Sequence, residues 1–153
     1  MKRIVLTLLL GFTLPALADR LPLPADTPAS YAAECGSCHL AYPPALLAAG
    51  DWRRIMTGLD DHFGSDAAVD PQKRQEITTF LERHAGNSAK LGSASEPPRI
   101  SQTARFVRKH REVPARLWHD PRVKSPANCE ACHRGATEGN YSEHDIAIRE
   151  LKR

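Results

Sequence analysis

One five-residue pattern, C-x-x-C-H, occurs twice in this 153-residue chain and constrains its fold more than any other feature. The copies are CGSCH at residues 35–39 and CEACH at residues 129–133, and together they contain all four cysteines. This pattern is the attachment site of a c-type haem, in which two thiols bond to the haem vinyl groups and the histidine binds the iron. The predicted attachment residues are Cys35, Cys38, Cys129 and Cys132, and the predicted first iron ligands are His39 and His133. We therefore expect two covalently bound haem c groups.

A C-x-x-C pair is also found in thioredoxin-like redox sites, in halves of zinc sites and in simple disulfides. A redox dithiol requires a βαβ context, which the sequence does not show. A zinc site would require the two copies, which start 94 residues apart at positions 35 and 129, to converge in space. It would also leave both histidines unexplained. Haem attachment is the interpretation that accounts for the whole pattern.

Residues 1–18 have the three parts of a signal peptide. Lys2 and Arg3 precede an apolar run at residues 4–10, and Ala16 and Ala18 suit signal peptidase. We expect cleavage before Asp19 and a mature protein in the periplasm, because covalent haem attachment takes place on the outer side of the bacterial membrane. After cleavage no other segment is expected to cross a bilayer. The apolar stretch is short for a spanning helix, although an uncleaved anchor remains the alternative.

The core of the mature chain looks thin for its length. Removal of 18 residues from 153 leaves 135, which is enough for one domain or two very small ones. Only 6% of the residues are aromatic, and there are 12 prolines. Two haems would compensate, because each is a large apolar body around which few side chains can pack. We therefore predict that the haem-free chain does not fold stably.

Helical patterns dominate, and no segment shows the alternation of a strand, which predicts a mainly α fold. We expect a first haem domain at residues 19–86, a linker at 87–98 and a second, smaller and less regular haem domain at 99–153. The linker is rich in small and polar residues and ends in Pro97-Pro98. Helices are predicted at residues 30–39, 44–49, 52–59, 72–84 and 100–112. The proposed N-caps are Asp51, Asp70 and Ser101.

Charge is distributed unevenly along the chain. Residues 19–87 contain ten acidic and six basic side chains, a net charge of −4, whereas residues 99–124 contain eight basic and two acidic ones, a net charge of +6. Such asymmetry can orient a docking partner. A solvated helix face or compensation of haem propionates would also explain the basic segment. The basic stretch at residues 105–124 predicts that haem 2 is the easier one to reduce. Nucleic acid is not expected as a partner of an exported protein.

The iron ligands opposite His39 and His133 must come from a short set of side chains. The remaining histidines are His62, His84, His110, His119 and His144, and Met56 is the only methionine after cleavage. Methionine is the usual second ligand in high-potential c-type cytochromes, and two haems cannot share one. At least one haem is therefore bound by two histidines, is five-coordinate or has an unusual ligand.

For haem 1 we favour His62 over Met56. The order of haem motif, short helix, ligand loop and final helix resembles the class I cytochrome c fold, in which the second ligand lies in the loop before the last helix. His62 occupies that loop, ahead of the helix predicted at residues 72–84. Met56 lies in an amphipathic set with Ile55 and Leu59, where core packing is the expected role.

For haem 2 three histidines remain candidates. His110 follows Phe106 by one helical turn on the apolar side of its helix and is preferred. His119 could reach the iron from a loop, and His144 could do so from the C-terminal segment. His84 lies at the polar end of its helix and is expected to be solvated or to interact with the helix dipole.

Four runs of sequence resemble the small bacterial family of dihaem cytochromes c. They are ECGSCHLAYPPALL at residues 34–47, LDDHFG at 59–64, FVRKHREV at 106–113 and SPANCEACHRGA at 125–136. The resemblance covers nearly all of the mature chain. It implies a secreted, soluble protein with a class I-like first domain, and two bis-histidine haems in which His39 pairs with His62 and His133 pairs with His110. It also implies redox proteins as partners, among them a membrane b-type cytochrome or a small oxygen-binding cytochrome.

A bis-histidine iron has no open position for a substrate, so these features predict an electron carrier and not an enzyme. Imidazole stabilises ferric iron better than a thioether does, so low potentials are expected. One alternative is a dihaem subunit of a periplasmic reductase, although the wide spacing of the motifs counts against it. Another is a ligand-binding haem protein, which would apply if haem 2 lacks a sixth ligand. A haem-based sensor is a further reading, but no output domain is present.

Overall fold

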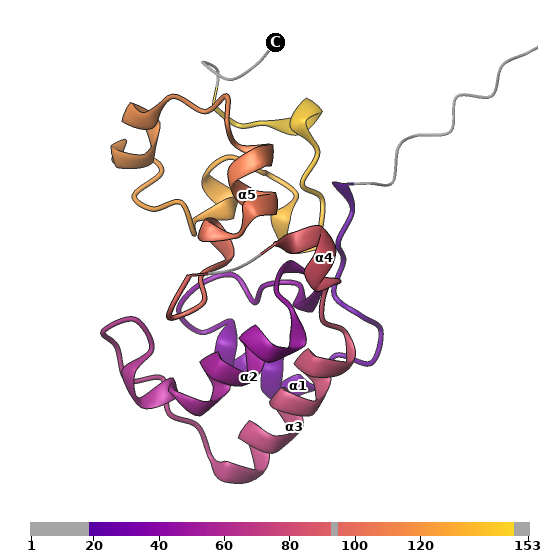
Figure 1. Ribbon diagram of the computed structural model, residues 1–153. Coiled ribbons are helices and arrows are strands. Elements are labelled where there is room, and N and C mark those ends of the chain that lie inside the picture. The colour runs from indigo at the N-terminus through magenta and orange to yellow at the C-terminus, as the bar shows by residue number, and fades with distance from the viewer. Residues whose placement is uncertain (1–18, 93–94, 149–153) are drawn as a thin grey trace, which may run out of the picture.

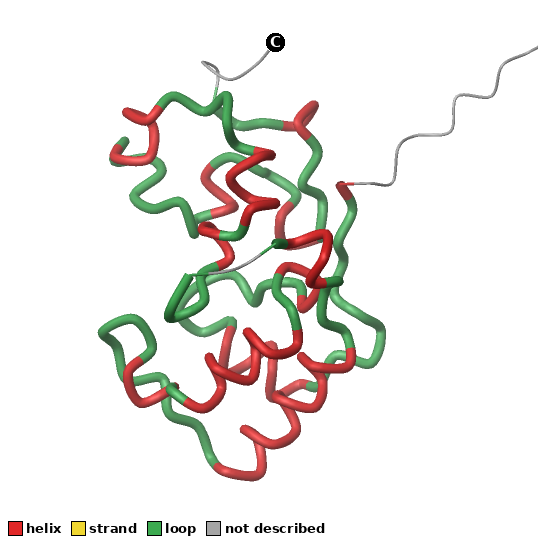
Figure 2. The backbone as a smooth tube through the Cα atoms, in the orientation of Figure 1, coloured by secondary structure: helices red, strands yellow, loops and turns green. Residues whose placement is uncertain are grey.

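The computed structural model describes residues 19–92 and 95–148, so the predicted signal peptide at residues 1–18 lies outside the described part of the chain. Its α-helices are α1 (Ala29–Cys35), α2 (Ala49–Thr57), α3 (Pro71–Arg83), α4 (Ser88–Leu91) and α5 (Ala104–Lys109). Shorter 3-10 helices are Pro44–Leu46, Leu59–Asp61, Ile100–Gln102, Ala115–His119, Cys129–Ala131, Ala136–Glu138 and Glu143–Asp145. Within the described ranges, extended pairing is limited to isolated bridges, and no helix has the length and apolar character to span a membrane. Figure 2 shows helices joined by long loops, which confirms the mainly helical fold class.

Helices α1, α2 and α3 form the first half of the molecule around one apolar cluster (Figure 1). Its buried members are Tyr31, Leu47, Trp52, Met56, Ile77, Phe80 and Leu81. The indole nitrogen of Trp52 donates to the Pro44 carbonyl at 2.7 Å, so the one polar atom of this large side chain is satisfied inside the core. Ile77, Phe80 and Leu81 form the apolar face that α3 contributes to this cluster.

Helix α3 begins as the sequence predicts, because the Asp70 carboxylate accepts from the backbone nitrogens of Gln72 and Lys73. The N-cap predicted at Asp51 is wrong. Helix α2 starts three residues earlier than predicted, after the extended residue Ala48, and takes Asp51 into its first turn. There the Asp51 carboxylate pairs with Arg54 at 2.6 Å. An acidic side chain is favourable both as a cap and in a first turn, so residue type alone did not fix the start of this helix.

The second half is less regular, as predicted, and its buried cluster contains only Leu117, Val123 and Ile148. The helix expected over residues 100–112 is interrupted. A 3-10 turn at Ile100–Gln102 is followed by the extended residue Thr103, which caps α5 by accepting from the Phe106 nitrogen at 3.1 Å. Thr103, and not Ser101, is therefore the N-cap of this helix.

The segment predicted as a linker contains the short helix α4. Asn87 caps this helix, and Leu91 within it is only 3% exposed. Gly92, with a φ of +76°, follows at its end, and a Cβ built there would lie 2.6 Å from the Cβ of Ala104. The connection between the halves is therefore packed against the start of α5 (Figure 1).

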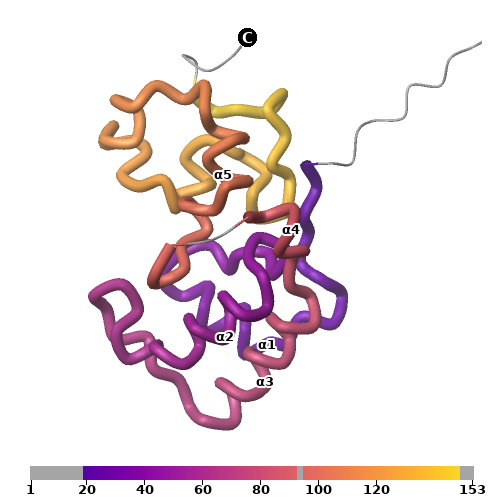
Figure 3. The backbone as a smooth tube through the Cα atoms, in the orientation of Figure 1, coloured from indigo at the N-terminus to yellow at the C-terminus, as the bar shows by residue number. Residues whose placement is uncertain are grey.

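The two halves also interlock through the chain that precedes α1. Leu21 donates its backbone N–H to the Gly139 carbonyl at 2.7 Å, and Tyr141 donates to the Asp19 carbonyl at 2.9 Å. Gly139 has a φ of +71°, and a Cβ there would lie 2.4 Å from the Cα of Pro22. In Figure 3 the indigo N-terminal segment accordingly runs beside yellow chain of the second half. Residues at the start of the predicted first domain thus pack against the second.

Candidate functional site

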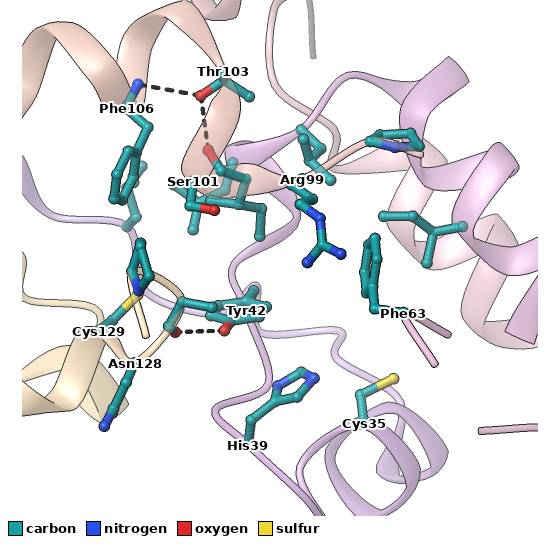
Figure 4. A pocket seen from close by; sticks show the side chains of 18 of the residues that line it. Cys35, His39, Tyr42, Phe63, Arg99, Ser101, Thr103, Phe106, Asn128 and Cys129 are labelled. Atoms are coloured by element: carbon teal, nitrogen blue, oxygen red, sulfur yellow. Dashed lines mark hydrogen bonds between the residues drawn. The ribbon is translucent and has the colours of Figure 1, made fainter. Parts of the chain in front are cut away.

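A single large cavity of about 1090 Å³ lies between the two halves and contains the side chains that the sequence singled out. Typical ligand pockets span roughly 300–1,000 Å³, so this one is at the upper end of that range. Part of its wall is shown in Figure 4. All eight predicted attachment and iron-ligand residues line it: Cys35, Cys38, His39, His62, His110, Cys129, Cys132 and His133.

The first motif begins where α1 ends. Cys35 is the last residue of α1, and the following turn places His39 with its Nδ1 2.8 Å from the Leu40 carbonyl. His62 comes from the loop after the 3-10 helix Leu59–Asp61, where His62 and Ser65 exchange backbone hydrogen bonds of 2.8 and 3.3 Å. The ring centres of His39 and His62 are 6.2 Å apart, and their planes are inclined by 25°.

The second motif is built on the 3-10 turn Cys129–Ala131, and His133 donates its backbone N–H to the Cys129 carbonyl at 2.8 Å. His110 is the C-cap residue of α5. Its Nδ1 lies 2.9 Å from the Phe106 carbonyl, and its ring stacks on that of Phe106 with 3.9 Å between centres. The ring centres of His110 and His133 are 6.2 Å apart, and their planes are perpendicular, at 90°.

In each histidine pair, the distance between the ring centres is the one expected for two rings that bind the same metal ion. A metal–imidazole bond is about 2 Å long, so two rings bound through nitrogen on opposite sides of an ion have centres about 6 Å apart. In His39 and His110, Nδ1 faces a backbone carbonyl, which leaves Nε2 as the nitrogen for the metal. The residues present therefore fit two bis-histidine irons.

Of the four alternative ligands, Met56 and His144 also line the cavity. Met56 is 3% exposed and belongs to the apolar core of the first half, which confirms its predicted packing role. The Nε2 of His84 lies 3.0 Å from the Asp26 carboxylate. His119 is exposed and is not among the side chains that line the cavity, whereas His144 is exposed but does line it. His144 is thus the remaining competitor of His110.

Burial sets the protonation state of the site. It lowers the pKa of His62, of His110 and of His133, which favours the neutral imidazole that can bind a metal. The charges of His39 and Arg99 lower the pKa of His62 further. Burial raises the pKa of the Cys35 and Cys129 thiols to about 11, so this apolar wall disfavours thiolates. A thioether is uncharged and suits such a wall.

Two buried polar atoms on the cavity wall make no hydrogen bond of normal geometry to the described residues: the Tyr141 hydroxyl and Nδ1 of His133. The backbone of Ser142 lies near His133 and raises the pKa of its imidazole, whereas burial lowers that pKa. The rings of Tyr141 and His133 are in contact, with centres 5.6 Å apart. Buried polar atoms are normally satisfied, so the unpartnered Tyr141 hydroxyl fits a site that takes a further group.

Sequence reasoning did not single out Tyr42 and Arg99, which join the two halves at the cavity. The ring of Tyr42 stacks on His39 with 4.9 Å between centres, and its hydroxyl donates to the Ala127 carbonyl at 2.6 Å (Figure 4). Arg99 lies over the ring of Phe63, with 4.0 Å from Cζ to the ring centre. Tyr42 was visible in the AYPP run as an aromatic residue just after the first motif, but nothing local indicated its distant partner.

Comparison with known proteins agrees with a site for two haems. The family model of dihaem cytochrome c matches residues 31–141. A dihaem cytochrome c from Shewanella baltica, solved by X-ray crystallography, is 40% identical over 82% of this chain and 95% of its own, with a TM-score of 0.71. A crystal structure of a Rhodobacter sphaeroides dihaem cytochrome c is 39% identical over 74% of this chain and 96% of its own, with a TM-score of 0.65. A second structure from that organism is 38% identical over 75% of this chain and 97% of its own, with a TM-score of 0.66. No protein with a curated description matches the chain.

Proposed function

This chain belongs to the dihaem cytochrome c family and carries two covalently bound haem c groups, and from that premise we propose that it is a periplasmic electron carrier with two bis-histidine irons. When bound, haem supplies reversible one-electron chemistry at its iron. The polypeptide contributes the ligands, the apolar surroundings and the local charge that tune it.

The two histidine pairs carry this proposal. His39 faces His62, and His110 faces His133, each pair with ring centres 6.2 Å apart. If each histidine pair held one iron, neither iron would offer a position for a substrate. The side chains then stay in place as the charge of the iron changes, which keeps reorganisation small. This arrangement supports electron transfer over catalysis.

The periplasmic location and the partners rest on the sequence. The pattern of residues 1–18 supports export. The net charge of +6 over residues 99–124 supports docking of a redox protein by electrostatic steering. Following the family resemblance, we propose a membrane b-type cytochrome or a small oxygen-binding cytochrome as the partner. The rate at which this partner binds the protein should then fall as the salt concentration rises.

Carbon monoxide tests the proposed function, because it binds ferrous haem only where an axial position is open. The visible spectrum of the dithionite-reduced holoprotein should be unchanged on addition of carbon monoxide. A change in about half of the haem would reveal one open iron. In that case ligand binding or catalysis at that iron would replace the electron-carrier proposal.

A further inference from the structure

Arg99 comes from the second half of the chain but lies at the first haem site. Its guanidinium carbon is 4.0 Å from the ring centre of Phe63, the residue next to His62. Arg99 lines the cavity together with His39 and His62, and Figure 4 shows its guanidinium lying between Phe63 and Tyr42. The first site is therefore completed by a cation from the other half.

Arg99 is distinct among the cationic side chains of the cavity wall, which are Arg99, Arg105 and Lys109. Lys109 is already paired with the Asp19 carboxylate at 3.0 Å. Within the described residues, Arg99 has no carboxylate within ion-pair distance, and its guanidinium lies over the ring of Phe63. Among the described residues, Arg105 makes no comparable stacking contact with an aromatic ring. Arg99 thus brings a guanidinium without a carboxylate partner to the cavity wall that His39 and His62 also line.

The group that enters this cavity needs such a cation. A haem has an apolar ring system and two carboxylates at one edge, and a carboxylate held at an apolar wall is costly unless a hydrogen-bonding cation meets it. Arginine provides a planar fork that matches a carboxylate, and it can stack on an aromatic ring at the same time. Arg99 is exposed, as expected for a side chain at the cavity mouth, where the charged edge would meet water.

We propose that Arg99 pairs with a propionate of haem 1, with Phe63 holding the guanidinium in place. The second half of the chain thereby supplies the charge partner of the haem attached to the first half. A positive charge beside haem 1 stabilises its reduced form, so Arg99 raises the potential of that haem. The inference rests on the proposed bis-histidine site of haem 1 and not on the identity of any redox partner.

Three variants of the holoprotein test this inference. R99Q removes the charge and the fork, R99K keeps the charge alone, and R116Q removes the charge of an exposed arginine outside the cavity wall. Potentiometric titration measures both haem potentials. Redox-difference infrared spectra, with haem labelled at the propionate carbons with ¹³C, report on the carboxylates themselves. The carbon monoxide test, applied to each variant, shows independently whether both irons remain six-coordinate.

In R99Q we expect one haem to become harder to reduce by roughly fivefold to tenfold in its equilibrium constant, where tenfold equals about 59 mV for one electron. The labelled carboxylate bands should shift in both R99Q and R99K, but not in R116Q. Equal potentials in R99Q and wild type would overturn the proposal. Carboxylate bands that stay unchanged in R99K and R99Q would also overturn the proposal. That result would mean that Arg99 affects the potential without contacting a propionate. Carbon monoxide binding by the wild type would instead contradict the proposed function.

Discussion

At the level of single residues, the chemistry of the site depends on four histidines. The sequence identified His39 and His133 from their motifs. It favoured His62 from its place in the loop before the last helix of the first half, and His110 from the apolar side of its helix. The structure brings each favoured pair to a ring separation of 6.2 Å. Tyr42 and Arg99 could not be found this way, because their partners Ala127 and Phe63 are distant in sequence.

Replacing His62 should open haem 1. In H62A, about half of the ferrous haem should bind carbon monoxide, because His62 is the side chain that faces His39 across the cavity. The difference spectrum of the reduced protein measures this directly. H84A is the matched control, since His84 contacts Asp26 and should leave both irons closed. A closed haem 1 in H62A would transfer the ligand role to another side chain, with Met56 next in order.

Replacing His110 should open haem 2 in the same way. His110 stacks on Phe106 and faces His133, so in H110A we expect carbon monoxide to bind at haem 2 and not at haem 1. The variants H119A and H144A complete the comparison. We expect both to behave as wild type. If haem 2 bound carbon monoxide in H144A and not in H110A, its second ligand would be His144, which also lines the cavity.

At the level of elements, the sequence located the helices better than their first residues. Asp70 followed by proline specified the start of α3 without ambiguity, because the cap and the first position agree. At α2 the acidic residue Asp51 suited two positions, and the extended conformation of Ala48 decided between them. At α5 both Ser101 and Thr103 could cap, and only the local backbone shows which does.

The cap of α3 gives a stability prediction. D70A should lower the free energy of unfolding by about 1 kcal/mol, because two backbone N–H groups at the start of the helix lose their acceptor. Thermal or denaturant unfolding of the holoprotein measures the change. D60A removes an exposed carboxylate from a different turn and should stay within about 0.5 kcal/mol of wild type. Equal loss in both variants would mean that capping does not contribute.

At the level of the whole molecule, the two halves share one cavity and are tied together by side chains and by backbone. The predicted boundaries at residues 86 and 99 follow composition, and composition does not register contacts such as Leu21 with Gly139 or α4 with α5. Local patterns determine each helix, whereas contacts between distant segments determine how the halves interlock. Failure of the haem-free chain to fold stays a prediction, and the large shared cavity agrees with it.

Tyr42 provides a test of this interlocking. Y42F should reduce stability by about 0.5–1.5 kcal/mol, because the Ala127 carbonyl loses a hydrogen bond of 2.6 Å that joins the halves. Its absorption spectrum should match wild type, since the ring on His39 remains. Y42L removes the ring as well and should also perturb haem 1. Unchanged stability in Y42F would show that this bond does not hold the halves together.

The central claim, that each iron lies between two histidines, is tested most directly by electron paramagnetic resonance of the fully oxidised holoprotein. The two imidazole planes of the His39–His62 pair are inclined by 25°, and rings in this arrangement would make two iron orbitals unequal in energy. The planes of the His110–His133 pair are inclined by 90°, and rings in this arrangement would leave the same two orbitals nearly equal in energy. We therefore expect two low-spin signals of equal intensity, one rhombic and one with a single large g value, and loss of only the rhombic signal in H62A. A high-spin signal in the wild type, or the signature of a methionine ligand, would contradict the account.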